Sequence, residues 1–566
     1  MNSTPGRRIL RAVQLPDSSN LADYFLFERL KDGLGSKDAL AYGARRYSYD
    51  VVAERTRAMT SLLVRAGIRR GERVLIVLPD APPFAWVFFG VLARGAVVAM
   101  GNPDASPEQV AYLVRYTRAT AVVTVPRVAE QLAKEPHDEL IHVWVVPETK
   151  TGEDPEAPLV PPLGHPPTRP KASDLAADLA KASTEHASIR LHIDEPAVWL
   201  FTSGSTGEPK ANIHSHRDFI FNTEVYAKNT VGYGREDVTV SVPRLFFGYA
   251  TGTNLMFPFA VGATVGLFSE RPTPDSLRRA IEEYRATVVT NVPTMLGKLL
   301  DHDEAARQRG EPGLAFSSVR FSLSAGEALP EALLRRWQAR FGSDVYDGIG
   351  SAEMFHIYAS NRPGDIKPGS LGRVVFGYEL RILPEDAEGA GATPCAPGEI
   401  GVLWVKGDSV SHGYWLDRAK SWSTFHGHWC RTGDLFSIDS EGYLYFAGRA
   451  DELLKVSGLW VAPFEVEECL MGHDAVSLAA VIGVEDAGLM KIKAFIVLRS
   501  EHIHRAGAAL ESELQDFVKA KIAKHKYPRT VEFVDDVPKN DRGKVDRKAL
   551  RAREVAARSG DPKSAT

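Results

Sequence analysis

Cysteine is scarce in this sequence, which contains only Cys395, Cys430 and Cys469 among its 566 residues. The three cysteines lie far apart and match neither the spacing of a metal site nor that of a disulfide framework. Unpaired thiols, together with the lack of an apolar signal-peptide core near the first residue, predict a cytoplasmic protein.

Long hydrophobic runs and an excess of charge of one sign are absent as well. The most apolar run, residues 85–100, is broken by Arg94 and Gly95, so it predicts a buried helix followed by a strand rather than a membrane span. The formal net charge is −4, which gives no reason to expect nucleic acid or an anionic membrane as a partner. A chain of 566 residues is too long for one ordinary core and predicts two or more domains.

Signatures of two large enzyme classes are also missing. No Gly-x-x-x-x-Gly-Lys-Ser/Thr nucleotide loop can be drawn through residues 202–210. We find no convincing Ser-His-Asp or Cys-His arrangement for covalent catalysis. His214 and His216 stand two residues apart, which suits neither a helical metal pair nor a catalytic base, so both are predicted to be structural.

Residues 198–210 form the most informative stretch of the chain. Residues 198–201 are apolar and predict the end of a buried strand, and residues 202–207 (Thr-Ser-Gly-Ser-Thr-Gly) follow directly. Glycines let a backbone approach a ligand and turn its N–H groups inward, hydroxyls add donors, and Lys210 adds a mobile positive charge. The stretch is therefore either a polyanion-binding loop or simply a flexible Gly/Ser loop.

Strand and helix patterns alternate along the chain around this stretch. The predicted strands are residues 73–79, 96–100, 121–125, 288–293 and 319–325. The predicted helices are residues 84–93 and 107–116, a helix after residues 212–216, and one that opens at Pro330. Such alternation is typical of parallel sheets with helices on their faces, where ligands bind at the carboxyl ends of the strands.

Residues 243–252 concentrate aromatic side chains between glycines. Phe247 and Tyr249 there are either part of the core or the walls of a flat apolar slot that holds a planar ring.

Residues 345–356 are expected to form a glycine-rich turn with polar side chains. In it Tyr346 can stack on a purine and Asp347 can accept a hydrogen bond from an exocyclic amine. Glu353 offers a hard oxygen to Mg²⁺. By themselves, one tyrosine and two acids in a turn are weak evidence for a site.

The last part of the chain changes character near residue 448. The section before it is β-rich, with predicted strands near residues 377–383 and 401–405, and residues 448–455 combine glycine with alternating charges as a linker does. Beyond the linker the predicted helices and strands, residues 464–471, 476–483, 491–498 and 511–524, make a small α+β domain. We therefore predict an N-terminal domain of residues 1–448 and a C-terminal domain of residues 449–566.

The string at residues 202–210 resembles the phosphate loop of the adenylate-forming superfamily, which includes acyl-CoA synthetases, luciferases and peptide-synthetase adenylation domains. Residues 243–252 are similar to the acid-binding motif of benzoate–CoA ligases, and residues 324–327 and 347–353 to the adenine and magnesium motifs of that group. Residues 538–544 resemble the closing Pro-Lys-Thr-x-Thr-Gly-Lys motif, with Asn540 and Arg542 in place of the two threonines. The resemblance covers roughly residues 20–550, with the motifs in the family's order.

This resemblance implies an α/β fold with a large N-terminal domain, a β-rich subdomain and a small mobile α+β C-terminal domain. The implied activity is that of an AMP-forming aryl carboxylate–CoA ligase. It would activate benzoate or a substituted benzoate such as 2-aminobenzoate (anthranilate) with ATP and then form a thioester with coenzyme A. ATP, Mg²⁺ and coenzyme A are the implied cofactors, and the protein would be a monomer or homodimer.

The resemblance also assigns roles to individual residues. Lys544 and Glu353 are the implied catalytic residues, and Glu353 is also the metal ligand. The implied contacts of ATP and AMP are Thr202, Ser203, Gly204, Ser205, Thr206, Gly207, Lys210, Gly326, Glu327, Tyr346, Asp347, Gly348, Ser351, Asp434 and Arg449. The implied aryl acid pocket consists of Phe247, Gly248, Tyr249, Gly350 and His356. Asp451 is the implied hinge, and the coenzyme A channel is formed by Ser457, Gly458, Leu459 and Trp460.

Several positions depart from the family pattern. Ala352 replaces the threonine with which most relatives contact the α-phosphate, so that donor is missing unless Ser351 or the loop hydroxyls substitute for it. Gly248 stands where benzoate–CoA ligases carry alanine, and the extra room suits a ring substituent such as an ortho amino group. His356 lies either near the ring pocket or in a structural position.

Two other functions stay open at this point. One is an enzyme that loads an aryl acid onto the phosphopantetheine of a carrier protein. The other is a nucleotide-binding regulator without turnover, which Ala352 and the unusual Asn540 and Arg542 favour slightly. Carboxylate-dependent exchange of pyrophosphate into ATP would dismiss the regulator.

Overall fold

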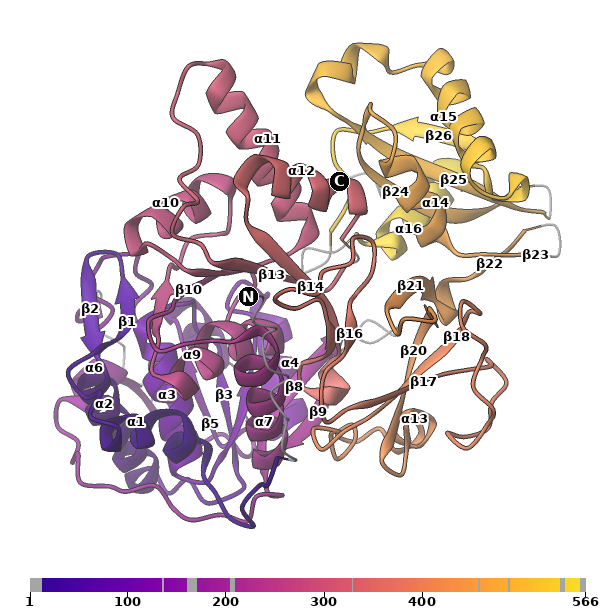
Figure 1. Cartoon of the computed structure of the whole chain (residues 1–566). Helices are drawn as coiled ribbons and strands as arrows, with labels where there is room; N and C mark the ends of the chain where they lie inside the picture. Colours follow the sequence, from indigo (N-terminus) through magenta and orange to yellow (C-terminus); the bar gives the residue numbers. More distant parts are fainter. Residues whose placement is uncertain are drawn as a thin grey trace, which may run out of the picture.

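The structure is a computed structural model that describes residues 13–134, 137–159, 171–203, 209–327, 329–456, 459–486, 489–539 and 545–559. Two mainly parallel sheets with their helices form its N-terminal part, an antiparallel sheet follows, and a smaller α+β unit ends the chain (Figure 1). The fold class predicted from the sequence, α/β with a β-rich subdomain and a small C-terminal domain, is confirmed.

The first sheet carries the stretch at residues 198–210. Its strand order is β7 (Lys171–Asp174), β6 (His142–Val145), β5 (Ala121–Thr124), β3 (Arg73–Ile76), β4 (Val97–Met100), β8 (Pro196–Ser203) and β9 (Pro209–Ser215). Neighbouring strands run parallel except β8 and β9, which form an antiparallel pair. The helices in this part are α2 (Tyr49–Arg65), α3 (Pro82–Ala93), α4 (Pro107–Thr117), α5 (Pro126–Leu132) and α6 (Leu175–Leu179).

The second sheet carries the other predicted motifs. Its order is β16 (Arg373–Val374), β15 (Ile357–Ser360), β14 (Asp344–Gly350), β13 (Phe321–Ala325), β12 (Val288–Asn291), β10 (Val238–Ser241), β11 (Thr264–Leu267), β1 (Asp38–Tyr42) and β2 (Arg45–Ser48). The remaining α-helices of the N-terminal part are α1 (Glu28–Lys31), α7 (His216–Asn222), α8 (Gly248–Thr251), α9 (Phe257–Val261), α10 (Pro274–Tyr284), α11 (Pro293–Gln308) and α12 (Glu331–Phe341). Wider π-helical turns at Asp23–Phe27, Thr223–Val231 and Gly252–Met256 adjoin α1, α7 and α9.

Helix α3 shows how the sequence builds the core between these layers. Every one of its residues is buried, including Trp86, Phe88 and Phe89. A helix that is apolar on all sides is stable only where it is surrounded by protein. The run at residues 85–100 is therefore a buried helix followed by strand β4, as predicted, and none of the helices within the described ranges is long and apolar enough to cross a membrane.

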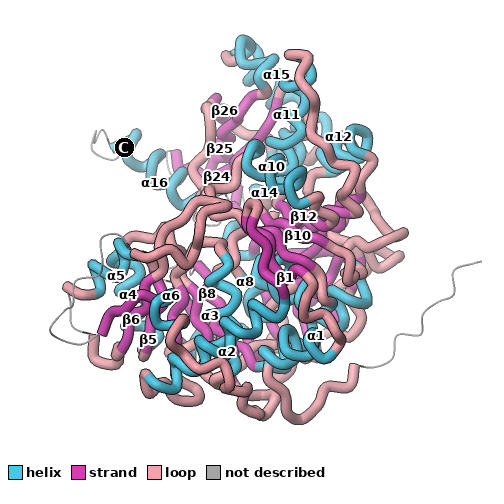
Figure 2. The backbone as a smooth tube through the Cα atoms, turned by 90° about the vertical axis from the view of Figure 1, so that its left-hand side faces the viewer, coloured by secondary structure: helices cyan, strands magenta, loops and turns pink. Residues whose placement is uncertain are grey.

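The β-rich part and the C-terminal unit complete the chain. The antiparallel sheet contains β17 (Glu379–Leu383), β18 (Gly401–Lys406), β20 (Trp429–Ile438), β19 (Phe425–His426) and β21 (Leu444–Arg449), with helix α13 (Arg418–Thr424) beside it. The C-terminal unit consists of β22 (Leu454–Val456), β23 (Leu459–Val461), α14 (Pro463–Met471), β24 (Val476–Asp486), β25 (Leu489–Leu498), α15 (Ala508–Lys521), β26 (Thr530–Phe533) and α16 (Arg547–Ser559). It lies at the same end of the molecule as α11 and α12 (Figures 1 and 2).

One expectation about local structure was wrong. Residues 345–350, expected as a turn, are strand β14, which pairs with β13 on one side and β15 on the other. Pairing with these neighbouring strands overrides the low strand propensity of glycine. The helix expected after residues 212–216 is α7, which the chain enters from strand β9.

Candidate active site

The predicted phosphate loop lies at the end of the β8–β9 hairpin. Thr202 pairs with Lys210 and Ser203 with Pro209, while Gly204, Ser205, Thr206 and Gly207 lie outside the described residues. Lys210 is not a freely mobile charge, because its Nζ donates to Asp417 Oδ2 at 2.8 Å. Asp417 also caps the first turn of α13 by accepting from the Lys420 N–H. The lysine is thus held beside the hairpin by a partner 207 residues away.

The predicted adenine motifs meet at one edge of the second sheet. Strands β13 and β14 are parallel neighbours in which Ser324 pairs with Asp347 and Ala325 with Gly348. Gly326 and Glu327 follow β13 directly, and Glu327 accepts a hydrogen bond from Thr294 Oγ1 at 2.9 Å. Carboxyl ends of parallel strands are where open α/β sheets bind ligands.

Asp347 is the polar centre of this edge. Its side chain is 3% exposed and accepts from the Leu329 N–H at 3.2 Å through Oδ2. Its Oδ1 is buried without a partner within the described chain. A buried acceptor of this kind fits an exocyclic amine, since an unmade hydrogen bond there costs about 1–3 kcal/mol.

The stacking role expected for Tyr346 is not supported. Its side chain is only 4% exposed, and its ring packs on Phe321 with the centroids 5.1 Å apart. Successive residues of a strand face opposite sides, so Tyr346 points away from the face that Asp347 occupies. The half-buried Ile349 shares the face of Asp347, and the alternation of β14 would have indicated this had the segment been recognised as a strand.

The pH dependence of stability tests this view of Asp347. Burial raises its pKa from 3.8 to about 7. An acid with a raised pKa stabilises the fold fully below its unfolded pKa, and this contribution is lost as the pH rises through about 7. The free energy of unfolding of the wild type, relative to Asp347→Asn, should therefore fall between about pH 4 and about pH 7 by up to about 4 kcal/mol. Urea unfolding at several pH values measures the difference, and parallel pH profiles would contradict it.

The predicted magnesium ligand lies on the short 3₁₀ turn Ala352–Met354, directly after β14. Glu353 is half-buried, and its Oε1 accepts from the phenol of Tyr414 at 2.7 Å. The Ser351 Oγ beside it is buried without a partner among the described residues. A hydroxyl in that position fits the donor role that Ala352 cannot fill.

The residues expected around the aryl acid come together at the start of α8. Phe247 caps this helix, and His356 lies beside Tyr249 with ring centroids 5.3 Å apart. The Nε2 of His356 lies 3.0 Å from the Tyr249 carbonyl oxygen. A Cβ on Gly350 would lie 2.5 Å from the carbonyl oxygen of His356, so only glycine lets β14 approach this segment.

Two polar atoms in this aromatic cluster have no partner among the described residues. Burial lowers the pKa of His356 to about 3, so the ring is neutral, and the carbonyl at Nε2 requires the proton to be there. Nδ1 is then a buried acceptor, and it has no partner within the described chain. The Tyr249 hydroxyl is likewise buried without one there. The cluster thus combines aromatic rings with two unmatched hydrogen-bonding groups.

The room expected at Gly248 is partly filled. A Cβ built on Gly248 would lie 3.1 Å from Cδ1 of Leu200, a side chain of strand β8. This is a tight contact with the movable end of a side chain. The space gained by the loss of a methyl group is therefore shared between Leu200 and the pocket.

Asp434 and Arg449 lie on paired strands of the β-rich sheet. Arg449 Nη1 donates to Asp434 Oδ1 at 3.1 Å, and the Asp434 N–H donates to Thr432 Oγ1. Asp434 belongs to strand β20. Burial, and next the charge of Asp434, raise the pKa of Tyr358 on β15, which places Asp434 near the second sheet.

The hinge and channel residues are only partly described. Asp451 belongs to a short 3₁₀ turn, Ala450–Glu452, between β21 and β22. Ser457 and Gly458 lie outside the described residues, between β22 and β23. Leu459 is 51% exposed, and the backbone of Trp460 pairs with Lys455.

Lys544 lies outside the described residues, but both flanks of its segment are placed. Lys539 and Val545 form a β-bridge with each other. Burial, and next the charge of Lys539, lower the pKa of Lys298 on α11. Although burial opposes it, the carboxylates of Glu467, Glu452 and Glu327 raise the pKa of Arg547. The chain thus enters and leaves residues 540–544 beside α11 and the edge that carries Glu327.

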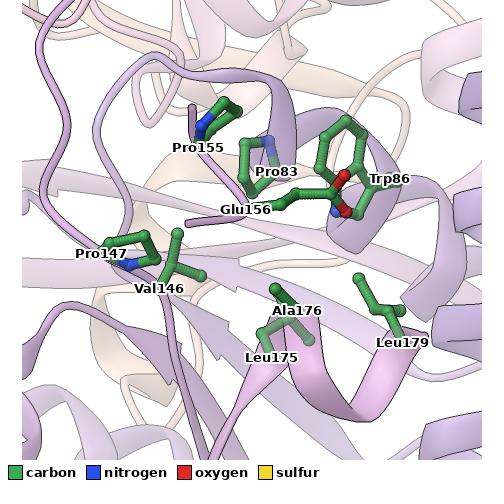
Figure 3. A pocket seen from close by; sticks show the side chains of 9 residues that line it. All are labelled: Pro83, Trp86, Val146, Pro147, Pro155, Glu156, Leu175, Ala176 and Leu179. Carbon is green, nitrogen blue, oxygen red and sulfur yellow. The ribbon is translucent and has the colours of Figure 1, made fainter. Parts of the chain in front are cut away.

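A shallow pocket elsewhere in the first sheet region is unrelated to these residues. It is lined by Pro83, Trp86, Val146, Pro147, Pro155, Glu156, Leu175, Ala176 and Leu179 (Figure 3). The carboxylate of Glu156 is paired with Arg55 at 2.9 Å. None of the predicted site residues lines this pocket, which we interpret as a packing gap between α3 and α6.

The sequence matches two families of known proteins. Residues 27–415 match the AMP-binding enzyme family and residues 465–544 the AMP-binding enzyme C-terminal domain. A benzoate–CoA ligase of Thauera aromatica is 39% identical over 96% of this chain and 97% of its own length. An anthranilate–CoA ligase of Pseudomonas aeruginosa is 30% identical over 86% of this chain and 87% of its own.

Solved structures agree with these matches. The anthranilate CoA ligase AuaEII in complex with anthranoyl-AMP has a TM-score of 0.85 and 32% identity over 96% of this chain and 99% of that one. A benzoate CoA ligase from Burkholderia xenovorans has a TM-score of 0.81 and 34% identity over 94% and 100%. The resemblance seen in the sequence motifs is thereby confirmed, and the chain belongs to the AMP-binding enzyme family.

Proposed function

We propose that this protein is an aryl carboxylate–CoA ligase that forms an acyl-AMP intermediate. The observation that carries the proposal is the adjacency of three parts: the β8–β9 hairpin, the Glu353 turn and the aromatic pocket of Tyr249 and His356. A Cβ on Gly248 would lie 3.1 Å from Leu200 of β8, and the Glu353 turn lies between β14 and His356. A triphosphate held at the hairpin would thus lie next to an aromatic acid.

In the first step the substrate carboxylate oxygen attacks the α-phosphorus of ATP. An oxygen–phosphorus bond forms, the bond to the β-phosphate breaks, and pyrophosphate leaves. Positioning and charge neutralisation supply most of the catalysis in reactions of this kind. We assign these tasks to residues 202–210 at the β- and γ-phosphates, Ser351 and Lys544 at the α-phosphate, and Asp347 at the adenine.

Mg²⁺ fits the residues present at the turn. The Glu353 oxygen that does not accept from Tyr414, together with phosphate oxygens and water, is the oxygen set that this ion prefers. Bound there, it would neutralise charge on the triphosphate. Glu353 is the residue that would hold it.

In the second step the thiolate of coenzyme A attacks the acyl carbon, a carbon–sulfur bond forms, and AMP leaves. Lys544 is needed in the first step, whereas a thiol channel is needed in the second. We propose that residues 449–566 rotate about Asp451, in the hinge at residues 449–455, and bring Ser457, Gly458, Leu459 and Trp460 to residues 1–448. The three free cysteines favour a cytoplasmic location for this activity.

The decisive assay is acid-dependent exchange of labelled pyrophosphate into ATP, followed by thioester formation with free coenzyme A. Exchange with aryl acids and a coenzyme A thioester as product are expected. A thioester formed only on a phosphopantetheinylated carrier protein would identify the alternative loading enzyme. The absence of exchange with every substituted benzoate would refute the proposal.

The substrate we expect is a benzoate with a hydrogen-bond donor on the ring, such as 2-aminobenzoate. His356 Nδ1 accepts, and leaving it unpaired under bound benzoate would cost about 1–3 kcal/mol. We therefore expect kcat/KM for 2-aminobenzoate to exceed that for benzoate by about 10- to 100-fold, and His356→Leu to remove most of this preference. An unchanged ratio in His356→Leu would contradict the assignment of Nδ1.

Gly248→Ala provides a steric control for this prediction. The added methyl group must displace Leu200 or enter the pocket, so it should reduce the use of ortho-substituted acids more than that of benzoate. It leaves His356 untouched. If benzoate and 2-aminobenzoate are bound equally and Gly248→Ala changes neither, neither feature determines specificity.

A further inference from the structure

The backbone of the Ala352–Met354 turn is held at each of its carbonyl oxygens by a residue from another part of the chain. The Ala352 oxygen lies 2.5 Å from Nε2 of His214. The Glu353 oxygen accepts from the Ser411 N–H at 2.9 Å, and the Met354 oxygen accepts from Ser409 Oγ at 2.9 Å. With Tyr414 on Glu353 Oε1, these contacts fix both the turn and one carboxylate oxygen.

His214 is the buried member of this set. It is fully buried on strand β9, and its Nδ1 lies 2.6 Å from Oδ2 of Asp218, which is 2% exposed. Asp218 also accepts from the N–H and the hydroxyl of Ser215. The Ala352 oxygen can only accept, so Nε2 of His214 donates to it, and Asp218 at Nδ1 holds the ring in that orientation.

The residue that follows the turn has a strained backbone. Phe355, which follows it directly, has φ +65°, a value that costs a residue with a Cβ about 1–2 kcal/mol. The ring of Phe355 packs against the rings of Phe219 and His214, with centroid distances of 4.2 Å and 6.4 Å, respectively. His214 therefore braces both the carbonyl at the start of the turn and the ring at its end.

The same strand carries Lys210. His214 and Lys210 are four residues apart on β9, so their side chains leave the same face of the strand. One bonds the Glu353 turn and the other Asp417. The residues around 412–415 add backbone bonds to β9, among them the Ile213 N–H to Gly413 oxygen and the Trp415 N–H to Ala211 oxygen. The phosphate hairpin and the turn are thus parts of one hydrogen-bonded unit.

We propose that His214, oriented by Asp218, is a positioning residue that sets the Glu353 carboxylate for the metal–nucleotide complex before that complex binds. His214 touches no reacting atom; it acts through the Ala352 carbonyl. The role assigned to Glu353 belongs to the proposed function, so this inference rests on it.

The test compares His214→Gln with His214→Leu. The glutamine amide can still donate to the Ala352 oxygen, whereas leucine of similar size cannot. Affinity for MnATP, measured by electron paramagnetic resonance without any acid present, should fall about tenfold in His214→Leu and recover to within about threefold of wild type in His214→Gln. Thioester formation from supplied acyl-AMP should change little in either variant.

Two results would overturn the positioning role: unchanged MnATP affinity in His214→Leu, or an equal loss in both variants. Equal loss of both half-reactions, with a lowered unfolding midpoint, would show a purely structural histidine and overturn it as well. The outcome is separable from the proposed function. If the wild type makes no thioester from any aryl acid while His214→Leu still weakens MnATP binding and glutamine restores it, the ligase proposal fails and the role of His214 stands.

Discussion

Replacing Lys544 by alanine should slow acyl-AMP formation by at least about 100-fold and leave thioester formation from supplied acyl-AMP nearly unchanged. A lysine that meets charge developing at the α-phosphate contributes to the first transition state alone. Both flanks of its segment lie beside α11 and the strand edge that carries Glu327, because burial and next the charge of Lys539 lower the pKa of Lys298, and Glu327, after Glu467, contributes to the raised pKa of Arg547. Single-turnover measurements of each half-reaction separate the two effects.

Lys548→Ala is the matched control. Lys548 is an exposed lysine on α16, four residues further along, and its removal changes the charge by the same amount. It should leave both half-reactions within about twofold of wild type, as surface changes usually do. An equal loss of both half-reactions in Lys544→Ala would refute the division of labour between the steps.

Glu353→Gln is expected to reduce adenylation by about 100- to 1,000-fold, the cost of removing one preorganised electrostatic group from such a site. Glutamine keeps the shape of the side chain and an oxygen that can accept from Tyr414, so the change isolates the charge. Most of the loss should appear as a lower apparent affinity for the metal–nucleotide complex. Rates measured over a range of Mg²⁺ concentrations at fixed ATP would show it.

Tyr414→Phe separates the contribution of the hydrogen bond to Glu353 from that of the Glu353 charge. It leaves the Glu353 charge in place and removes only the 2.7 Å hydrogen bond to Oε1. We expect a loss of about tenfold, since the bond is to a charged group. A larger effect in Tyr414→Phe than in Glu353→Gln would show that the carboxylate is a structural group and not a metal ligand.

The short binding segments could be predicted from the sequence because each is local. At residues 202–207 the glycines and hydroxyl residues that would bind phosphate stand next to one another in the sequence, directly after an apolar strand. Phe247 and Tyr249 are likewise only two positions apart in the sequence. No knowledge of distant contacts is needed to identify such segments.

The expectations that failed depended on contacts that neighbouring residues in the sequence do not reveal. Tyr346 was expected to stack on a purine, but β14 turns it to the face opposite Asp347. Lys210 was expected to be mobile, yet the carboxylate of Asp417 holds it. The room expected at Gly248 is partly filled by Leu200, a side chain from strand β8 that is distant in the sequence.

The amino-acid sequence alone determined the α/β fold class, the order of the motifs and the aromatic residues expected around the acid. These features depend on apolar periodicity and on residue types at nearby positions, which the sequence shows directly. Only the tertiary structure decided which atoms remain unpaired, as at His356 Nδ1, and which residues hold Glu353. The contacts to the 3₁₀ turn come from β9 on one side and from residues 409–414 on the other. They exist only because packing brings residues up to 138 positions from the turn, as His214 is from Ala352, within hydrogen-bonding distance.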